Sequence, residues 1–189
     1  MKGLEESAGA ASEAMREAES EREREIAVSR KVIRLSKTAI SVIQRSGDPG
    51  RFIAEMEEEL GKIRCVTQPA LDSVCEYAEA VLLHCAVSGK PVPDYREMGI
   101  PPGQWILGLC DCEGEIRRMI MTHLMKGELD PAAGLFGIME EIHETVMSFD
   151  IPDALAPVRR KQDIARGIMD KTRSDMLNAV CMDNFLKKM

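Results

Sequence analysis

Two otherwise apolar stretches of the chain each contain a pair of acidic residues at helical spacing: Glu76 with Glu79, and Asp111 with Glu115. Residues three or four positions apart lie on the same face of a helix, so each stretch presents two carboxylates in one direction. If the two helices pack together, the four carboxylates meet and raise one another's pKa values unless a cation joins them. Carboxylate oxygens suit Mg²⁺, with Mn²⁺ as the alternative. The spacing therefore predicts a divalent-cation site that is also the catalytic site.

The chemistry expected of such a site is hydrolysis at phosphorus. A bound Mg²⁺ lowers the pKa of a water molecule, aligns it, and neutralises the charge that develops on the phosphate. One carboxylate can accept the proton while the others hold the metal, and the sequence leaves open which residue does which. Asp72 lies one turn before Glu76, and we interpret it as auxiliary to the site.

A basic stripe follows one face of the first predicted helix. At about 100° per residue, one narrow arc collects basic side chains, and the opposite arc holds Val32, Leu35, Ile40 and Ile43. A second basic cluster follows the acidic pair of the fourth helix. These cations are predicted to bind the phosphate backbone of a nucleic acid, and the alternative is an ordinary solvated or salt-bridged face. The predicted nucleic-acid contacts are Arg30, Arg34, Lys37, Arg45, Arg117 and Arg118.

The elements that position these residues are all predicted to be helices. Alternation of apolar and polar residues, which would indicate strands, is absent. Asp130 and Pro131 form a helix-start signal, with the aspartate as cap and the proline in the first turn. We predict an all-α protein, an up-down helical bundle of about six or seven helices in a single domain spanning residues 1–189. A charged helical extension, 1–25, frays or projects into solvent. The expected helices cover about 4–44, 52–66, 69–87, 101–125, 130–149 and 154–186.

Composition narrows the class of protein. Hydrophobic residues make up 44% and aromatic residues only 4%, which is typical of a helical bundle packed with aliphatic side chains. The net charge of −7 argues against a protein that coats nucleic acid indiscriminately. We expect no membrane contact and a cytoplasmic location, because no apolar run reaches roughly 18 residues and the N-terminus is unlike a signal peptide. The cysteines form no C-x-x-C pair, which favours reduced, buried thiols.

The second acidic pair lies in a segment that carries a family resemblance. Residues 106–118, Ile-Leu-Gly-Leu-Cys-Asp-Cys-Glu-Gly-Glu-Ile-Arg-Arg, closely resemble the signature helix of the translin superfamily. Glu76-Tyr-Ala-Glu-Ala80 resembles the acidic segment of that superfamily's catalytic branch, translin-associated factor X. Arg30-Lys-Val-Ile-Arg-Leu-Ser-Lys37 resembles its first-helix segment, and the order of helices agrees from about residue 26 onward. The compact length resembles an archaeal member.

The resemblance implies an all-helical subunit of a hollow, closed, eight-membered barrel that binds single-stranded RNA or DNA. It implies a Mg²⁺-dependent endoribonuclease whose active site lies on the inner wall. The family's metal-binding carboxylates match Glu76, Glu79, Asp111 and Glu115, a set that translin itself lacks in part. This chain therefore resembles the catalytic relative, and we expect a homo-oligomer without a separate translin partner.

Three other functions fit parts of the pattern. A single-strand-binding scaffold would have the same basic stripe with inactive carboxylates. All-helical nucleoside triphosphate pyrophosphatases also cluster Glu and Asp around Mg²⁺, and the run 57–59 is three glutamates. A ferritin-like di-iron protein would need two Glu-x-x-His motifs. This chain has one, at Glu140 and His143.

Overall fold

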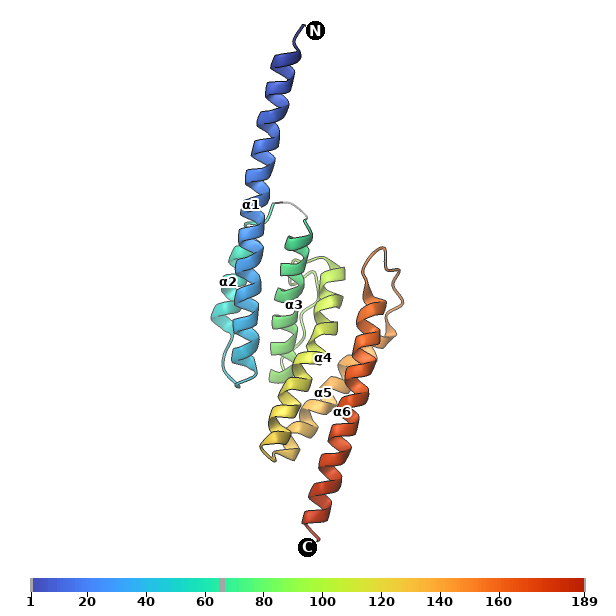
Figure 1. Ribbon diagram of the computed structural model, residues 1–189. Coiled ribbons are helices and arrows are strands. Elements are labelled where there is room, and N and C mark those ends of the chain that lie inside the picture. The colour runs from blue at the N-terminus through green and yellow to red at the C-terminus, as the bar shows by residue number, and fades with distance from the viewer. Residues whose placement is uncertain (1, 65–66, 189) are drawn as a thin grey trace.

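The computed structural model describes residues 2–64 and 67–188, and every regular element within those ranges is an α-helix (Figure 1). The predicted all-α fold with a long first helix is confirmed. The part of the second predicted helix that fell on Cys65 and Val66 lies outside the described residues. The helices are α1 (Leu4–Ile43), α2 (Gly50–Leu60), α3 (Gln68–Ser88), α4 (Pro102–Met125), α5 (Leu129–Ser148) and α6 (Val158–Leu186).

Several helix ends differ from the sequence-based boundaries. Helix α2 stops at Leu60, where Gly61 takes the cap position. Helix α5 begins before Asp130, with Glu128 at the cap position, so Asp130 lies in the first turn and was wrongly predicted as the cap. Its charge still suits the positive end of the helix dipole. Helix α6 begins after Pro157 and not at residue 154, because the residue before a proline avoids the helical conformation.

The helices pack around one apolar core. The second half of α1, α3 and α4 lie side by side, α2 covers α1, and α5 and α6 pack against α4 (Figure 1). Helices α3 and α4 contribute Leu82, Leu83, Ile116 and Ile120 to the centre, where they are almost completely buried together with Met56, Met139 and Met169 from the surrounding helices. The two helices that carry the acidic pairs therefore form the middle of the bundle.

A glycine sets how closely α3 and α4 approach. A Cβ atom on Gly108 would lie 2.7 Å from the Cβ of Ala78 and 2.8 Å from the backbone nitrogen of Glu79. Real Cβ atoms do not approach other atoms so closely, so the position requires glycine. The contact lies beside Glu79, and the close approach therefore brings the acidic residues of α3 near those of α4.

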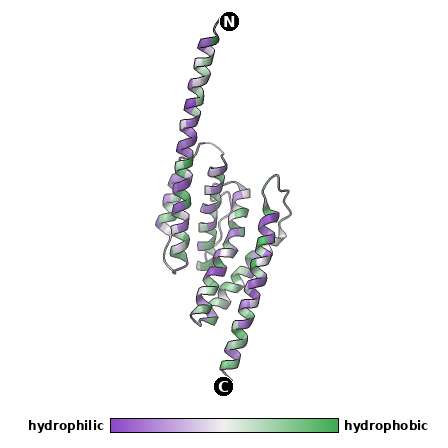
Figure 2. Cartoon of the chain, in the orientation of Figure 1, coloured by the Kyte–Doolittle hydropathy of each residue, from purple (hydrophilic) through white to green (hydrophobic). Residues whose placement is uncertain are grey.

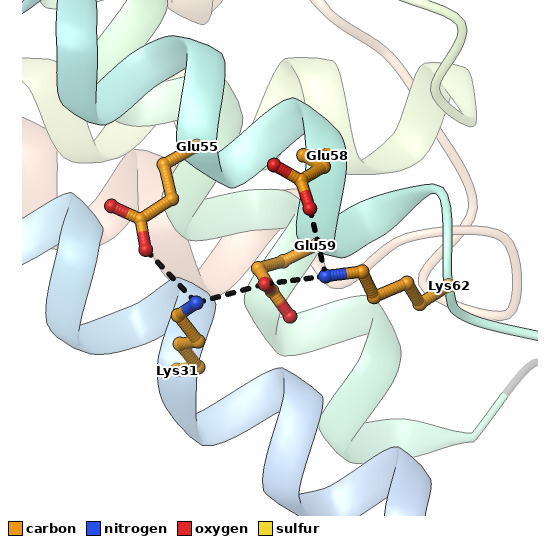
Figure 3. A network of polar contacts seen from close by, with 5 residues as sticks. All are labelled: Lys31, Glu55, Glu58, Glu59 and Lys62. Carbon is orange, nitrogen blue, oxygen red and sulfur yellow. Dashed lines mark hydrogen bonds and ion pairs between the residues drawn. The ribbon is translucent and has the colours of Figure 1, made fainter.

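An ion-pair network joins α1 to α2 (Figure 3). Lys31 Nζ lies 2.9 Å from Glu55 Oε1 and 2.8 Å from Glu59 Oε1, and Lys62 Nζ lies 2.7 Å from the same Glu59 oxygen and 3.1 Å from Glu58. Hydrogen bonds from the two lysines lower the pKa of Glu59. The network therefore connects this part of α1 to α2.

Two helix ends project from the bundle. Residues 4–20 of α1 are exposed throughout, and Figure 1 shows this part of α1 extending beyond the other helices. At the opposite end, the C-terminal part of α6 projects and carries green, apolar positions in Figure 2. Exposed apolar residues there include Leu177, Met182, Phe185 and Leu186. Within the described ranges, no helix is long and apolar enough to cross a bilayer.

Candidate active site

The four predicted carboxylates line one pocket of about 370 Å³, which we call the carboxylate pocket. Helix α3 contributes Glu76 and Glu79, helix α4 contributes Asp111 and Glu115, and α6 adds Lys161 from the facing side. The side chains that helical spacing grouped in pairs are therefore brought together by the packing of α3 against α4.

A second pocket of about 400 Å³ adjoins the first and shares Glu76, Glu79 and Glu115 with it. Its remaining lining comes from α1 and from the next turn of α4, and we call it the basic pocket because two of these residues are cations. The cations are Lys37 and Arg118, and the other lining residues from α1 and its cap are Ile40, Ser41 and Gln44. The three shared glutamates therefore have Asp111 and Lys161 in one pocket and Lys37 and Arg118 in the other.

Glu79 is the most buried of the four carboxylates, with 8% of its surface exposed. Burial, followed by the neighbouring carboxylates of Asp111, Glu76 and Glu115, raises its pKa to about 8 against the opposing charge of Lys161. Within residues 2–64 and 67–188, no hydrogen-bond donor reaches its carboxylate. Without a bound cation, most Glu79 side chains are therefore protonated at neutral pH.

Glu76 is only half-buried, and it lies between the two pockets. Burial raises the pKa of its carboxyl, Lys37 lowers it, and Asp111 raises it. Ser36 of α1 donates a 2.8 Å hydrogen bond to the backbone carbonyl of Glu76, which fixes α3 against α1 at this level. The basic stripe and the carboxylates are therefore linked by direct contact between their helices.

Both carboxylates of α4 already form ion pairs or hydrogen bonds with side chains of the protein. Asp111 Oδ1 forms an ion pair with Lys161 Nζ, and its Oδ2 lies 3.9 Å from the Sγ of Cys75. Glu115 accepts from Arg118 at 2.8 Å and from Gln44 Nε2 at 2.5 Å. In this arrangement, no three His, Cys, Asp or Glu side chains of the described chain are placed to hold a metal ion.

The type of donor nevertheless fits a hard divalent cation. The pocket offers carboxylate oxygens, the ligands that Mg²⁺ and Mn²⁺ prefer. Burial and the charge of Asp111 raise the pKa of the Cys75 thiol far above neutral pH, so the sulfur stays protonated and is a poor ligand for soft metals. To bind a cation, the carboxylates would have to exchange their protein donors for it.

Most of the predicted nucleic-acid contacts are available at the surface. Arg30, Arg34 and Lys37 are exposed along α1, and Lys37 reaches the basic pocket. Arg45 is exposed too, but it lies in the turn just beyond the end of α1 and not on the helical stripe predicted for it. Arg118 is exposed and lies at the same pocket.

The structure places two predicted residues elsewhere. Arg117 donates to Thr172 Oγ1 at 2.9 Å and to Asp175 Oδ2 at 2.8 Å, so it joins α4 to α6 and we leave it out of the proposed RNA contacts. Asp72 is exposed, accepts a hydrogen bond from Gln68, and lines neither pocket.

Three residues near the site were missed by sequence reasoning. Gln44 follows Lys37 by seven positions, and this helical spacing could have placed it at the basic pocket. Lys161 stood in a basic run, but its partner lies 50 positions away on another helix. Glu113 is fully buried on the other side of α4, where its Oε2 lies 3.0 Å from His143 Nδ1. This contact gives His143 a partner within the helical core.

Fold and site together define an all-α protein whose central helices enclose a carboxylate pocket beside a cationic surface. The chain belongs to the translin superfamily, the family of archaeal C3PO, which includes RNA-binding nucleases. It is 30% identical over 172 residues to the uncharacterised protein MJ0175 of the archaeon Methanocaldococcus jannaschii, covering 86% of this chain and 78% of that protein. The family resemblance expected from the sequence is confirmed.

Solved structures agree with this assignment. The structure of AfC3PO in complex with duplex RNA has a TM-score of 0.81 and 26% identity, and covers 92% of this chain and 96% of that one. A crystal structure of AfC3PO also gives 0.81 and 26%, with 92% and 97% covered. Apo-NeC3PO, at 21% identity and a TM-score of 0.76, covers 95% and 98% and shows the same fold. No family model matches the sequence.

Proposed function

We propose that this protein is a Mg²⁺-dependent endoribonuclease that cleaves single-stranded RNA within a closed homo-oligomer. The observation that carries the proposal is the convergence of Glu76, Glu79, Asp111 and Glu115 on one pocket, directly beside a pocket with two cations. A carboxylate cluster favours a divalent cation, and the adjoining cations favour phosphate. A phosphodiester held across the two pockets satisfies both.

The chain's own residues have distinct functions in this proposal. Lys37 and Arg118 would bind phosphate oxygens next to the scissile bond, and the rest of the basic stripe would guide the strand along α1. The four carboxylates would hold Mg²⁺ or Mn²⁺. The cation supplies an activated water molecule and neutralises charge on the phosphate. One of the carboxylates accepts the proton that the attacking water loses.

The form of the RNA is a separate question. AfC3PO, at 26% identity, has been crystallised with duplex RNA, and this supports RNA as the polymer bound by the present chain. Our proposal remains cleavage of single strands, with single-stranded DNA as a second ligand. Matched single-stranded and duplex RNAs of one sequence, compared in the same assay, distinguish the two forms.

The test is cleavage of an end-labelled RNA by the purified protein with Mg²⁺ and with EDTA. In Mg²⁺, Glu79→Gln and Asp111→Asn should abolish cleavage and keep or tighten RNA binding, because each removes a carboxylate that would be ionised with the cation bound. The matched control is Glu144→Gln, an exposed glutamate of α5 outside both pockets. Equal cleavage by both site variants and the control would refute the site. RNA binding without cleavage in the unmodified protein would favour the scaffold function, and hydrolysis of free nucleotides alone would favour the pyrophosphatase.

Assembly into a closed homo-oligomer of eight subunits is part of the proposal. The apolar side chains exposed on the projecting end of α6, among them Phe185 and Leu186, support burial against another copy. Light scattering of the purified protein should give an eight-subunit mass. Phe185→Glu should reduce that mass because it places a charge in the apolar contact. A monomeric mass for the unmodified protein would contradict this part of the proposal.

A further inference from the structure

Lys161 is the basic residue among those that line the carboxylate pocket. It lies in the first turn of α6, and its side chain is one-third exposed, as is that of its ion-pair partner Asp111. The family resemblance gave it no function, and the proposed chemistry has so far not used it. Its position, facing α3 and α4 across the pocket, is where a cation would neutralise the carboxylates.

The backbone beside Lys161 is firmly held. The next residue, Gln162, is buried, and its Nε2 donates to the carbonyl oxygens of Val146 and Phe149, both at 2.9 Å. These bonds fix the start of α6 to the end of α5. On the same face of α6, Ile164 and Ile168 also line the pocket. The ammonium group is thus supplied by a fixed helix and not by a loosely placed surface chain.

Lys161 determines what Asp111 can bind. One Asp111 oxygen is paired with the ammonium group, and the other faces the protonated thiol of Cys75. A divalent cation needs at least one free carboxylate oxygen from Asp111, so it competes directly with Lys161. The same ammonium group offsets the charge of the neighbouring glutamates. Lys161 therefore occupies the electrostatic place that a metal ion would take.

We propose that Lys161 is the internal counter-ion of the carboxylate pocket, which a divalent cation displaces from Asp111 and which then binds a phosphate of the RNA. The inference rests on the metal site of the proposed function in its first half and on RNA binding in its second. Competition between Lys161 and the cation is a property of the protein without RNA.

Metal affinity measured without RNA tests the first half. We would titrate Mn²⁺ into the purified protein by calorimetry and compare Lys161→Met with Arg160→Met, which removes the same charge from an exposed neighbour on α6. Lys161→Met should bind Mn²⁺ roughly tenfold more tightly, since removing a cation in direct contact with a ligand lowers electrostatic repulsion. Arg160→Met should change the dissociation constant by less than about twofold because solvent screens exposed charges. Unchanged or weaker binding by Lys161→Met would overturn the inference.

A charge-preserving variant covers the case in which Lys161→Met does not fold. Lys161→Arg keeps a cation that can pair with Asp111, so its Mn²⁺ affinity should stay near that of the unmodified protein. If Lys161→Met is unfolded, Lys161→Gln takes its place with the same expectation of tighter binding. Equal affinities of the Arg and Gln variants would likewise overturn the inference.

RNA binding tests the second half. With saturating Mn²⁺ in the cleavage-deficient Glu79→Gln background, adding Lys161→Met should weaken RNA binding several-fold and lower the salt slope by about one. An unchanged salt slope would contradict the proposed contact between Lys161 and a phosphate. Tighter Mn²⁺ binding by Lys161→Met, in a protein that never cleaves RNA, would count against the nuclease and support the counter-ion. Cleavage with no change in metal affinity would count against the counter-ion alone.

Discussion

Replacing Glu79 with glutamine should stabilise the protein, and the gain should grow with pH. The pKa of Glu79 is about 8 in the folded protein and 4.5 in the unfolded chain, so the folded state holds the proton more tightly. Because the folded pKa is raised, stability is highest below the unfolded value and is lost as pH rises from 4.5 to about 8. Glutamine has nearly the same shape and does not ionise, so the variant escapes this loss.

The expected magnitude follows from the two pKa values. One unit of pKa corresponds to about 1.4 kcal/mol. The free energy of unfolding of Glu79→Gln should therefore exceed that of the unmodified protein by almost nothing at pH 4. The excess should reach about 3 kcal/mol at pH 7 and about 5 kcal/mol at pH 9. These are upper values, because relaxation of the pocket around the charge reduces them.

Urea unfolding, followed by circular dichroism at one protein concentration in EDTA, measures the difference between pH 4 and pH 9. Glu144→Gln, the exposed control, should change the free energy of unfolding only slightly. Adding Mg²⁺ should reduce the pH dependence of the unmodified protein, since a cation stabilises ionised carboxylates. A Glu79→Gln difference that is constant across this range would refute the conclusion that burial and like charge keep Glu79 protonated.

Five other substitutions, one of them a control, test separate parts of the structure. Gly108→Ala should cost about 1–3 kcal/mol of stability because its Cβ has no room between α3 and α4, whereas Gly167→Ala, with open space around it, should gain up to about 1 kcal/mol in the same urea assay. Lys37→Ala should weaken RNA binding and lower its salt slope by about one, and an unchanged slope would remove Lys37 from the interface. Arg117→Ala should leave that slope unchanged and instead lower stability by about 1–2 kcal/mol, because it breaks two bonds to α6. Glu59 has a lowered pKa and adds stability above its ordinary value of 4.5 that is lost as the pH falls through the lowered one, so Glu59→Gln should show a smaller loss of stability in acid.

Local patterns predicted the helices and the acidic pairs well. Spacing of three or four residues determines which side chains share a helix face, so Glu76 with Glu79 and Asp111 with Glu115 could be grouped from the sequence alone. Their meeting in one pocket depends on the close approach at Gly108, a position whose tight contacts only the packed structure reveals. The catalytic function of these carboxylates stays a prediction.

Residues whose partners lie on distant helices could not be assigned from the sequence. Arg117 and Arg118 are adjacent, and nothing in their local pattern separates them. Successive helix positions are rotated by about 100°, so one faces α6 and the other the basic pocket. The ion pair of Lys161 and the bond between Glu113 and His143 have the same origin, because both depend on how α5 and α6 cross α4.

Because α1 is one continuous helix, its exposed N-terminal part is rigidly connected to the pocket. A single helix of 40 residues is about 60 Å long, and it carries the projecting residues 4–20, the basic stripe, and the wall of the basic pocket at Lys37. Such a rod has no hinge of its own between its ends, so whatever holds its outer end also sets the direction from which a strand meets the carboxylates. Immobilising the protein through residue 15 would therefore present the molecules, and their pockets, in one common orientation.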